Sequence, residues 1–293
     1  MICFVILHYI TINETINCVD SIIANINCEK KIIIVDNNSP NNSGSTLKEK
    51  YRMQNQCIVI KSNHNSGFAI GNNIGYKYAK ENFNPAFIVL LNNDIEISDK
   101  LFDKKIWDIY NKEHFFILGP DIFSKTYEIH QSPKCLTHYT LDKMERLHSH
   151  YKKIFKYKII LYIKCILKRS RWIKKLVYKY RRSKIDHRRI YYNVPLHGAC
   201  LIFSNKFITR FDEVFLETTF FYFESEILDY KCYIKDLKTM YSPEIQVFHH
   251  QNMTTDEVYA DVFERTKFAY KCNIESSKAF IDYIRNCTPT IIE

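Results

Sequence analysis

Asn92, Asn93 and Asp94 stand together directly after an apolar run at residues 87–91. A carboxylate flanked by amide side chains at the end of a buried strand suits a hard divalent cation. Mg²⁺ and Mn²⁺ prefer oxygen ligands, and they need few from the protein when a diphosphate supplies the others. The same residue types also favour β-turns for backbone reasons alone. Taken by itself, the cluster is more often a turn than a metal site.

Two further polar groups close apolar runs. Asp36 follows residues 31–35, where its carboxylate could accept a hydrogen bond from a nucleobase or ribose, or form an Asx-type turn. His249 and His250 follow residues 245–248, and an imidazole there could complete a metal site or contact a diphosphate. A histidine pair is more often structural, and the sequence leaves open which of the two would face a site.

Residues 63–75 read NHNSGFAIGNNIG and hold three of the six glycines. Gly67 would let the backbone approach a ligand at the start of a helix. Gly71 and Gly75 would share a helix face and allow close packing on a sheet. The segment does not contain GxGxxG, so it does not meet the dinucleotide-binding fingerprint.

Two carboxylates, Glu224 and Glu226, follow the aromatic run at residues 220–223. An acid against aromatic surface can have its pKa raised into the working range of a general base. The alternative is a solvated helix start, where acids are favoured by the helix dipole. The segment itself supports both interpretations equally.

Strand and helix patterns alternate through the first hundred residues and would position these groups. Continuous apolar runs predict buried strands at residues 2–7, 31–35, 57–61 and 87–91. Helices are predicted after a capping box at Thr11 and Glu14, at 47–53 and at 69–81. The alternation predicts a parallel, doubly wound α/β layer, in which ligands bind beyond the carboxyl ends of the strands. A second capping pattern, Thr254 with Glu257, predicts a C-terminal helix.

The order of these motifs resembles the family 2 glycosyltransferases of bacterial surface polysaccharide synthesis, especially the rhamnosyltransferase-like branch. The sequence carries, in order, VDNNS, NSGFAIGNN, LLNND, HGAC, FDE, FESEIL and a strand ending in HH. The resemblance is close over residues 2–98 and moderate over 194–250. It implies a GT-A fold, with a mixed, mainly parallel sheet flanked by helices. We expect a nucleotide-sugar-binding half at 1–133, a basic helical insert at 134–190, an acceptor and catalytic half at 191–250, and a C-terminal helical segment at 251–293.

The resemblance also implies an inverting transfer from a nucleoside diphosphate sugar to a glycan or lipid-linked glycan, assisted by Mg²⁺ or Mn²⁺. The donor would be bound by residues of the three polar loops: Asp36, Asn38, Asn65, Gly67, Asn72, Asn92 and Asn93. Asp94 would hold the metal with His249 or His250, and Gly198 with Ala199 and Cys200 matches an acceptor-side segment. The catalytic base would be Glu224 or Glu226, with a slight preference for Glu226. Two positions depart from the family: Ser225 stands where acids are usually consecutive, and Asn92 replaces the first acid of the DxD motif.

The basic character of the chain belongs to one segment. Residues 151–190 hold sixteen Lys or Arg and one acid, Asp186, whereas the whole chain carries a net charge of +10. Residues 159–163, and then Trp172, Ile173, Leu176, Val177 and Tyr180, suggest interrupted amphipathic helices. We expect residues 151–182 to contact an anionic membrane surface, with a solvated helical hairpin as the alternative. Nucleic acid is not expected as a partner, because no nucleic-acid-binding fold is recognised.

The remaining features narrow the compartment and the competing functions. Ten cysteines without a CxxC pair predict reduced thiols in a cytoplasmic protein. The basic segment predicts a peripheral position on the inner face of the cell membrane. Neither a signal peptide nor a transmembrane helix is expected. One competing function is a catalytically inactive GT-A scaffold of a polysaccharide assembly complex. A nucleotidyltransferase is disfavoured, because it would want a Gly-rich basic loop where residues 8–11 read HYIT.

Overall fold

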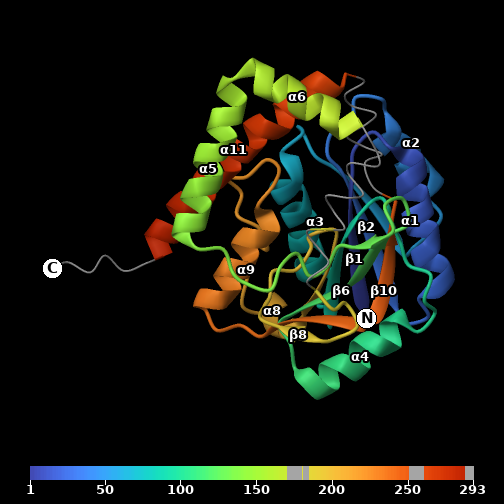
Figure 1. Cartoon of the computed structure of the whole chain (residues 1–293). Helices are drawn as coiled ribbons and strands as arrows, with labels where there is room; N and C mark the ends of the chain where they lie inside the picture. The colour runs from blue at the N-terminus through green and yellow to red at the C-terminus, as the bar shows by residue number, and fades with distance from the viewer. Residues whose placement is uncertain (170–179, 181–184, 251–260, 288–293) are drawn as a thin grey trace.

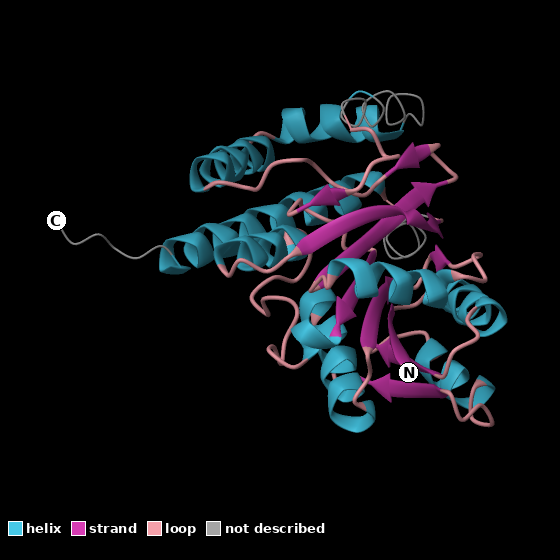
Figure 2. Ribbon diagram, turned by 90° about the horizontal axis from the view of Figure 1, so that it is seen from below, coloured by secondary structure: helices cyan, strands magenta, loops and turns pink. Residues whose placement is uncertain are grey.

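The computed structural model describes residues 1–169, 180, 185–250 and 261–287. Its centre is one sheet, whose strands are magenta in Figure 2. The strand order is β3-β2-β1-β4-β9-β6-β10-β5, with β7 added on β6 and β8 on β10. The strands are β1 (Ile2–His8), β2 (Lys30–Asp36), β3 (Cys57–Lys61), β4 (Phe87–Asn92), β5 (Ile95–Glu96), β6 (Ile117–Ser124), β7 (Ile129–His130), β8 (Tyr191–Tyr192), β9 (Cys200–Ser204) and β10 (Thr239–His249).

The sheet is mixed but mainly parallel, as the resemblance implied. β1 pairs in parallel with β2 and β4, and β2 pairs in parallel with β3. β9 runs antiparallel between β4 and β6, and β10 is parallel to β6. The four strands predicted in the first hundred residues are confirmed. The carboxyl ends of β1, β2 and β4, at His8, Asp36 and Asn92, meet at one edge of the sheet.

Helices cover both faces of the sheet (Figure 1). They are α1 (Ile12–Asn25), α2 (Ser43–Lys50), α3 (Gly67–Phe83), α4 (Phe102–Glu113), α5 (Leu141–Lys156), α6 (Lys158–Arg169), α8 (Asn205–Ile208), α9 (Glu224–Ile234) and α11 (Val262–Cys287). Alternate residues of β1 point to opposite faces, so Phe4 joins the core under α1, α2 and α4, while Val5 joins the core under α3, α8 and α9. Gly71 and Gly75 of α3 lie directly against Leu7 and Val5, which confirms the predicted packing face.

Two local predictions need adjustment, and a third is not tested. The helix expected at 47–53 is α2, which begins four residues earlier, after Asn42 in the left-handed conformation. Thr11 precedes α1 but makes no side-chain cap; instead its hydroxyl accepts a hydrogen bond from the Asn93 amide at 2.8 Å. Thr254 and Glu257, the predicted cap of the C-terminal helix, lie outside the described residues.

Within residues 134–190, α5 and α6 are the long described helices. α5 packs along α11, and their side chains form a third apolar core with Phe223 and Ile227 of the acidic segment. In Figure 1, α5 and α6 arch over the upper left of the molecule. Residues 170–179, which include Trp172, Ile173, Leu176 and Val177, lie outside the described residues. None of the described helices combines the length and the apolar character needed to cross a bilayer.

Candidate functional site

Asp94 and His249 lie side by side where β4 and β10 end. His249 pairs with Ile95 across the β5–β10 ladder, and the backbone N–H of His250 donates to the Asp94 carbonyl at 2.9 Å. These contacts place His249 Nε2 3.1 Å from Asp94 Oδ1, with both side chains buried. The approach is not that of a hydrogen bond, and Oδ1 has no hydrogen-bond partner. A buried carboxylate oxygen is thus left open toward an imidazole nitrogen.

Gln131 fixes the tautomer of His249. Its Oε1 lies 2.7 Å from His249 Nδ1. An amide oxygen only accepts, so Nδ1 carries a proton, and Nε2 is the ring nitrogen that faces Asp94. Two ligands at right angles on an octahedral Mg²⁺ lie about 3.0 Å apart. The observed Nε2–Oδ1 distance of 3.1 Å therefore fits a pair of metal ligands.

His250 points elsewhere. Its Nε2 lies 2.8 Å from Glu96 Oε2, and the same carboxylate pairs with Lys125 at 3.2 Å. Adjacent residues of an extended strand face opposite ways, so only one of the two histidines can reach Asp94. Of the pair left open by the sequence, it is His249 that faces Asp94.

The acidic segment begins α9, and its two glutamates have different surroundings. Lys134 Nζ lies 2.9 Å from Glu226 Oε1 and 2.8 Å from Ser225 Oγ. Burial would raise the pKa of Glu226, but the charge and hydrogen bond of Lys134 hold that pKa below its usual value. Glu224 Oε1 has no hydrogen-bond partner. Burial raises the pKa of Glu224 to about 7, and the nearby charge of Glu226 adds to the rise.

Two segments connect the glutamates to the Asp94–His249 pair. Gln131 and Lys134 are three residues apart, so residues 131–134 hold His249 at one end and Glu226 at the other. The turn before β9 makes the second connection. A Cβ on Gly198 would lie 3.5 Å from Ser225 Cβ, and the next residue, Ala199, accepts the Asn92 N–H at 2.9 Å. These two connections run between the glutamates and the Asp94–His249 pair.

The predicted donor loops are largely bonded to one another. Asp36 is buried, accepts the Ser39 N–H at 3.0 Å and packs against Gly44 at the start of α2. Asn38 next to it is partly exposed and left-handed, with φ 59°. His8, at the end of β1, contacts Thr15 and Ser43 hydroxyls at 2.7 Å each. Burial lowers the pKa of His8 to about 4, so this ring is neutral.

The loop before α3 is tied to both halves of the chain. Asn65 Oδ1 accepts from the Asn37 amide at 3.0 Å and from the Gly67 N–H at 3.1 Å. Gly67 has φ +79°, and a Cβ there would collide with the backbone of Phe220. The Phe68 N–H donates to the Phe220 carbonyl at 2.8 Å. The close approach that requires glycine is thus to the aromatic run before Glu224.

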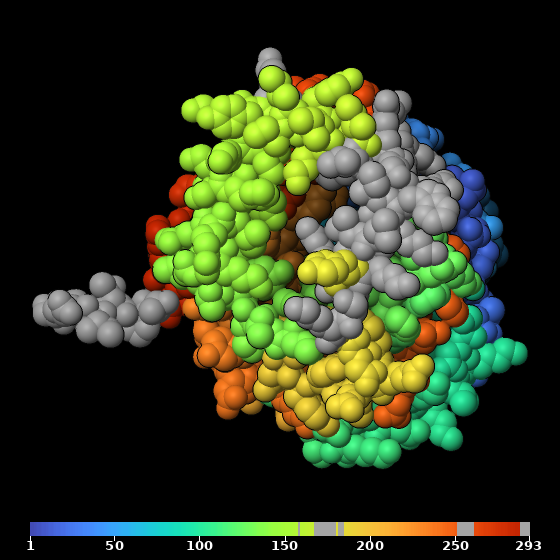
Figure 3. Space-filling model, in the orientation of Figure 1, coloured from blue at the N-terminus to red at the C-terminus, as the bar shows by residue number. Residues whose placement is uncertain are grey.

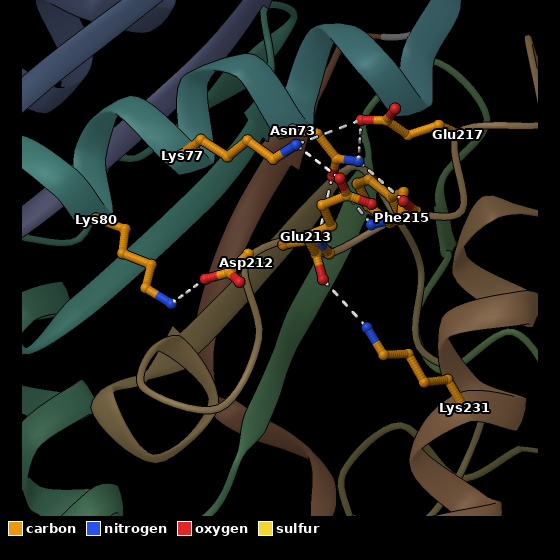
Figure 4. A network of polar contacts seen from close by, with 9 residues as sticks. Asn73, Lys77, Lys80, Asp212, Glu213, Phe215, Glu217 and Lys231 are labelled. Carbon is orange, nitrogen blue, oxygen red and sulfur yellow. Dashed lines mark hydrogen bonds and ion pairs between the residues drawn. The ribbon is translucent and has the colours of Figure 1, made fainter.

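Asparagines of α3 and of the strand end hold the scaffold. The Asn72 amide donates within α3 to the Phe68 carbonyl. Asn73 bonds Phe215 and Glu217, next to the ion pairs of Lys77 with Glu213 and Lys80 with Asp212; these contacts fasten α3 to the FDE motif (Figure 4). Asn93 is likewise committed, because its amide donates to the hydroxyls of Thr11 and Thr15. Asn92 is partly exposed at the end of β4.

Asp121, His130 and His187 form a second cluster of ligand-type side chains, which the sequence did not indicate. His130 Nδ1 lies 2.8 and 2.9 Å from the two Asp121 oxygens, and the Gln246 amide donates to Oδ2 at 2.7 Å. His187 Nδ1 donates to the Ser132 carbonyl at 3.0 Å, and its ring stacks on His130 at 4.7 Å.

The sheet with carboxylates and a histidine at its strand ends is that of the GT-A glycosyltransferases. The sequence model described as "Glycosyl transferase family 2" matches residues 3–208. The chain belongs to this family. Glu224, Glu226 and His249 lie beyond the matched residues, so their roles depend on the geometry above.

Solved structures share the fold at low identity. Residues 1–349 of TarS from S. aureus superpose with a TM-score of 0.53 at 12% identity, over 99% of this chain and 72% of that one. The same fragment in complex with UDP-GlcNAc gives 0.50 at 12% identity, over 98% and 72%. GalNAc-T7 with UDP, GalNAc and Mn²⁺ gives 0.55 at 13% identity, over 98% and 56%. Curated protein sequences give no significant match.

Several site residues escaped the sequence analysis. Gln131 and Lys134 sit in an irregular segment, and His197 precedes Gly198 in the HGAC motif, with its ring 6.0 Å from that of His249. Asp229 lies one turn after Ser225, bonds His138 at 2.9 Å, and has its pKa raised by burial to about 6. Only His197 had a signal, since it belongs to a motif that was recognised.

Proposed function

We propose that this protein is an inverting glycosyltransferase that moves a sugar from a nucleoside diphosphate sugar to a glycan or lipid-linked glycan. Family membership supports the reaction class. The observation that carries the proposal is the buried Oδ1 of Asp94, which has no hydrogen-bond partner and lies 3.1 Å from His249 Nε2. A site that leaves a buried carboxylate without a donor is prepared for a cation.

The donor would lie over the strand ends between Asp36 and Asp94. The related folds of TarS and GalNAc-T7 were solved with UDP-GlcNAc and with UDP, GalNAc and Mn²⁺, which supports a nucleoside diphosphate sugar here. Asn38 and Asn92 are partly exposed at this edge and are the loop residues best placed to meet it. The other predicted donor residues would act through the backbone of the loops that they hold in place.

Asp94 and His249 would hold Mg²⁺ or Mn²⁺, with Gln131 keeping the imidazole in the ligating tautomer. The bound cation supplies Lewis-acid stabilisation of the negative charge that the leaving diphosphate gains. His250 is proposed no longer as a ligand, because it is paired with Glu96.

Glu224 is the better candidate for the base, which reverses the preference from sequence. The acceptor hydroxyl must lose a proton as its oxygen attacks the anomeric carbon, and a base with a pKa near the working pH does this best. Glu224 has a pKa of about 7 and an oxygen without a partner. Glu226 is kept ionised by Lys134 and would instead set the electrostatics around Glu224. Pairs of carboxylates with divergent pKa values commonly divide their roles in this way.

The acceptor would belong to capsule, O-antigen or other surface polysaccharide synthesis, handled on the cytoplasmic side of the membrane. Ten free cysteines support a reducing compartment. The basic segment supports an acceptor presented at an anionic surface.

A thermal-shift screen over nucleotide sugars, with and without Mn²⁺, tests the proposal, because a ligand that binds only the folded state raises the melting temperature. We expect one donor to stabilise the protein only with Mn²⁺, and His249→Ala to abolish that shift. His250→Ala is the matched control on the same strand and should keep it. Equal behaviour of the two variants would refute the metal site. Mn²⁺-dependent donor binding without any transfer or donor hydrolysis would favour the inactive scaffold.

A further inference from the structure

α6 exposes one apolar face to solvent. Four large apolar side chains, at positions i, i+3, i+4 and i+7, share this face. They are Ile159, 77% exposed, Tyr162, 60%, Ile163, 51%, and Ile166, 52%. The opposite face buries Leu161 and Cys165, which are 3% and 5% exposed. The inner face alone accounts for packing on the protein, so the outer face needs another explanation.

A groove lies where α5 ends, two residues before the exposed face begins. Its volume is about 560 Å³. Phe155, Tyr157 and Ile274 give it an apolar wall between α5 and α11, and four lysine side chains, among them Lys156, line it against one carboxylate, that of Glu275. An apolar wall with a cationic rim fits an amphiphile whose head group is anionic.

The charge of the segment selects among possible partners. Residues 151–190 carry sixteen basic residues and one acid. A second copy of the chain docked on this face would bring two such segments together, and their repulsion would oppose the contact. A partner that is only apolar would leave the lysines without counter-charges. An anionic lipid surface satisfies both features, since acyl chains accept the apolar side chains and phosphates accept the lysines.

α6 has the dimensions of a helix that lies in the surface of a bilayer. Its twelve residues are too few to cross the hydrocarbon core, which takes about twenty. Tyr157 and Tyr162, both about half exposed or more, are residue types that settle at the level of the head groups.

We propose that the exposed face of α6, together with the lysine-lined groove between α5 and α11, docks the protein on an anionic bilayer. The isoleucines enter the head-group region and the groove lysines contact lipid phosphates. In Figure 3 the α5 and α6 side chains, in yellow-green, form one border of a hollow in the molecular surface. Docking there would set that hollow beside the membrane. A hollow beside the membrane would suit a lipid-linked acceptor, and only this last step rests on the proposed function.

The test is flotation of the full chain with vesicles of phosphatidylcholine alone, or with phosphatidylglycerol as about one lipid in three. We expect at least about tenfold stronger binding to the anionic vesicles. The double variant Ile163→Ser, Ile166→Ser should lose about tenfold or more of that binding, whereas Met53→Ser, at another highly exposed apolar residue, should lose none. Lys152→Gln with Lys156→Gln should weaken binding, and Lys48→Gln with Lys50→Gln on α2 is its matched control.

The flotation results have clear consequences for the proposed docking surface. Equal binding to both vesicle types, or full binding by the isoleucine variant, would overturn the proposal. Concentration-dependent dimers in sedimentation velocity that the isoleucine variant abolishes, without vesicle binding, would identify a second copy as the partner instead. Mn²⁺-dependent donor binding is measured without lipid, so a failure of the proposed function appears there and leaves the flotation result unaffected.

Discussion

Two Asp–His groups lie close together on this sheet, and they differ in what the aspartate accepts. Asp121 receives donors on both oxygens, from His130 Nδ1 and from the Gln246 amide. Asp94 faces His249 Nε2, and its Oδ1 receives no hydrogen bond. Three ligand-type side chains gather at Asp121 and only two at Asp94, yet it is Asp94 that keeps an oxygen without a hydrogen bond.

Ring geometry supports the same distinction. His130 and His187 stack with an interplanar angle of 15°. The lone pairs of imidazole nitrogens lie in the ring plane, so two nearly parallel rings do not aim at one ion. We infer that the Asp121 group is a clamp. It fixes the chain just before Gln131 and Lys134, the residues that hold His249 and Glu226.

The largest expected effect is on the rate of transfer, which should fall far more when Asp94 is replaced than when Asp121 is replaced. Asp94→Asn removes the charge of a metal ligand while keeping the shape of the side chain. We expect metal-dependent transfer to fall roughly 10³-fold, since Lewis-acid stabilisation contributes several kcal/mol. Asp121→Asn, the matched change in the clamp, should cost less than about tenfold. Steady-state rates with Mn²⁺, and Mn²⁺ binding by electron paramagnetic resonance, check both. Equal losses would remove the distinction.

The next largest effect concerns Glu224, and its readout is the pH profile of kcat/KM. The base must be deprotonated, so kcat/KM should rise with pH through about 7, the pKa of Glu224. Glu224→Gln should abolish this limb and cost roughly 10²- to 10⁴-fold.

The charges of Glu226 and Lys134 should shift the rising limb of the pH profile in opposite directions. Glu226→Gln removes a negative charge that raises the pKa of Glu224, so the limb should move to lower pH. Lys134→Met removes a positive charge that lowers it, so the limb should move to higher pH. A limb that survives Glu224→Gln and disappears in Glu226→Gln would return the base to Glu226.

The sequence predicted the strand ends but not the partners found there. The four apolar runs of the first half were strong enough to locate β1 to β4, and with them Asp36 and Asp94. It could not choose between His249 and His250, because that choice depends on the pairing of His249 with Ile95 in the two-residue strand β5. It could not separate Glu224 from Glu226, because the cation that changes the pKa of Glu226, Lys134, is 92 residues away in the chain. Contacts between distant segments leave no periodic signal.

A smaller effect tests Gln131 as the residue that orients the metal ligand. Gln131→Ala removes the acceptor for His249 Nδ1–H, so Mn²⁺ affinity should fall about 10- to 100-fold, as is usual for partners of ligating histidines. Gln131→Glu keeps an acceptor at that place and should restore affinity to at least the wild-type value. A purely structural role would show as lower thermal stability in both variants without this difference in affinity.

The smallest expected effect is on the free energy of unfolding. It should stay equal or rise when Asp94 is replaced, and it should fall when Asp121 is replaced. In metal-free protein, Asp94→Asn removes a buried carboxylate oxygen that has no hydrogen-bond partner and lies 3.1 Å from His249 Nε2. Unfolding in urea should therefore show equal or higher stability for this variant. Asp121→Asn replaces an acceptor that already has donors on both oxygens, which sets an N–H against a donor and should cost about 1–3 kcal/mol. If both variants were destabilised alike, Asp94 would be as well satisfied in the fold as Asp121, and its readiness for a cation would have no structural basis.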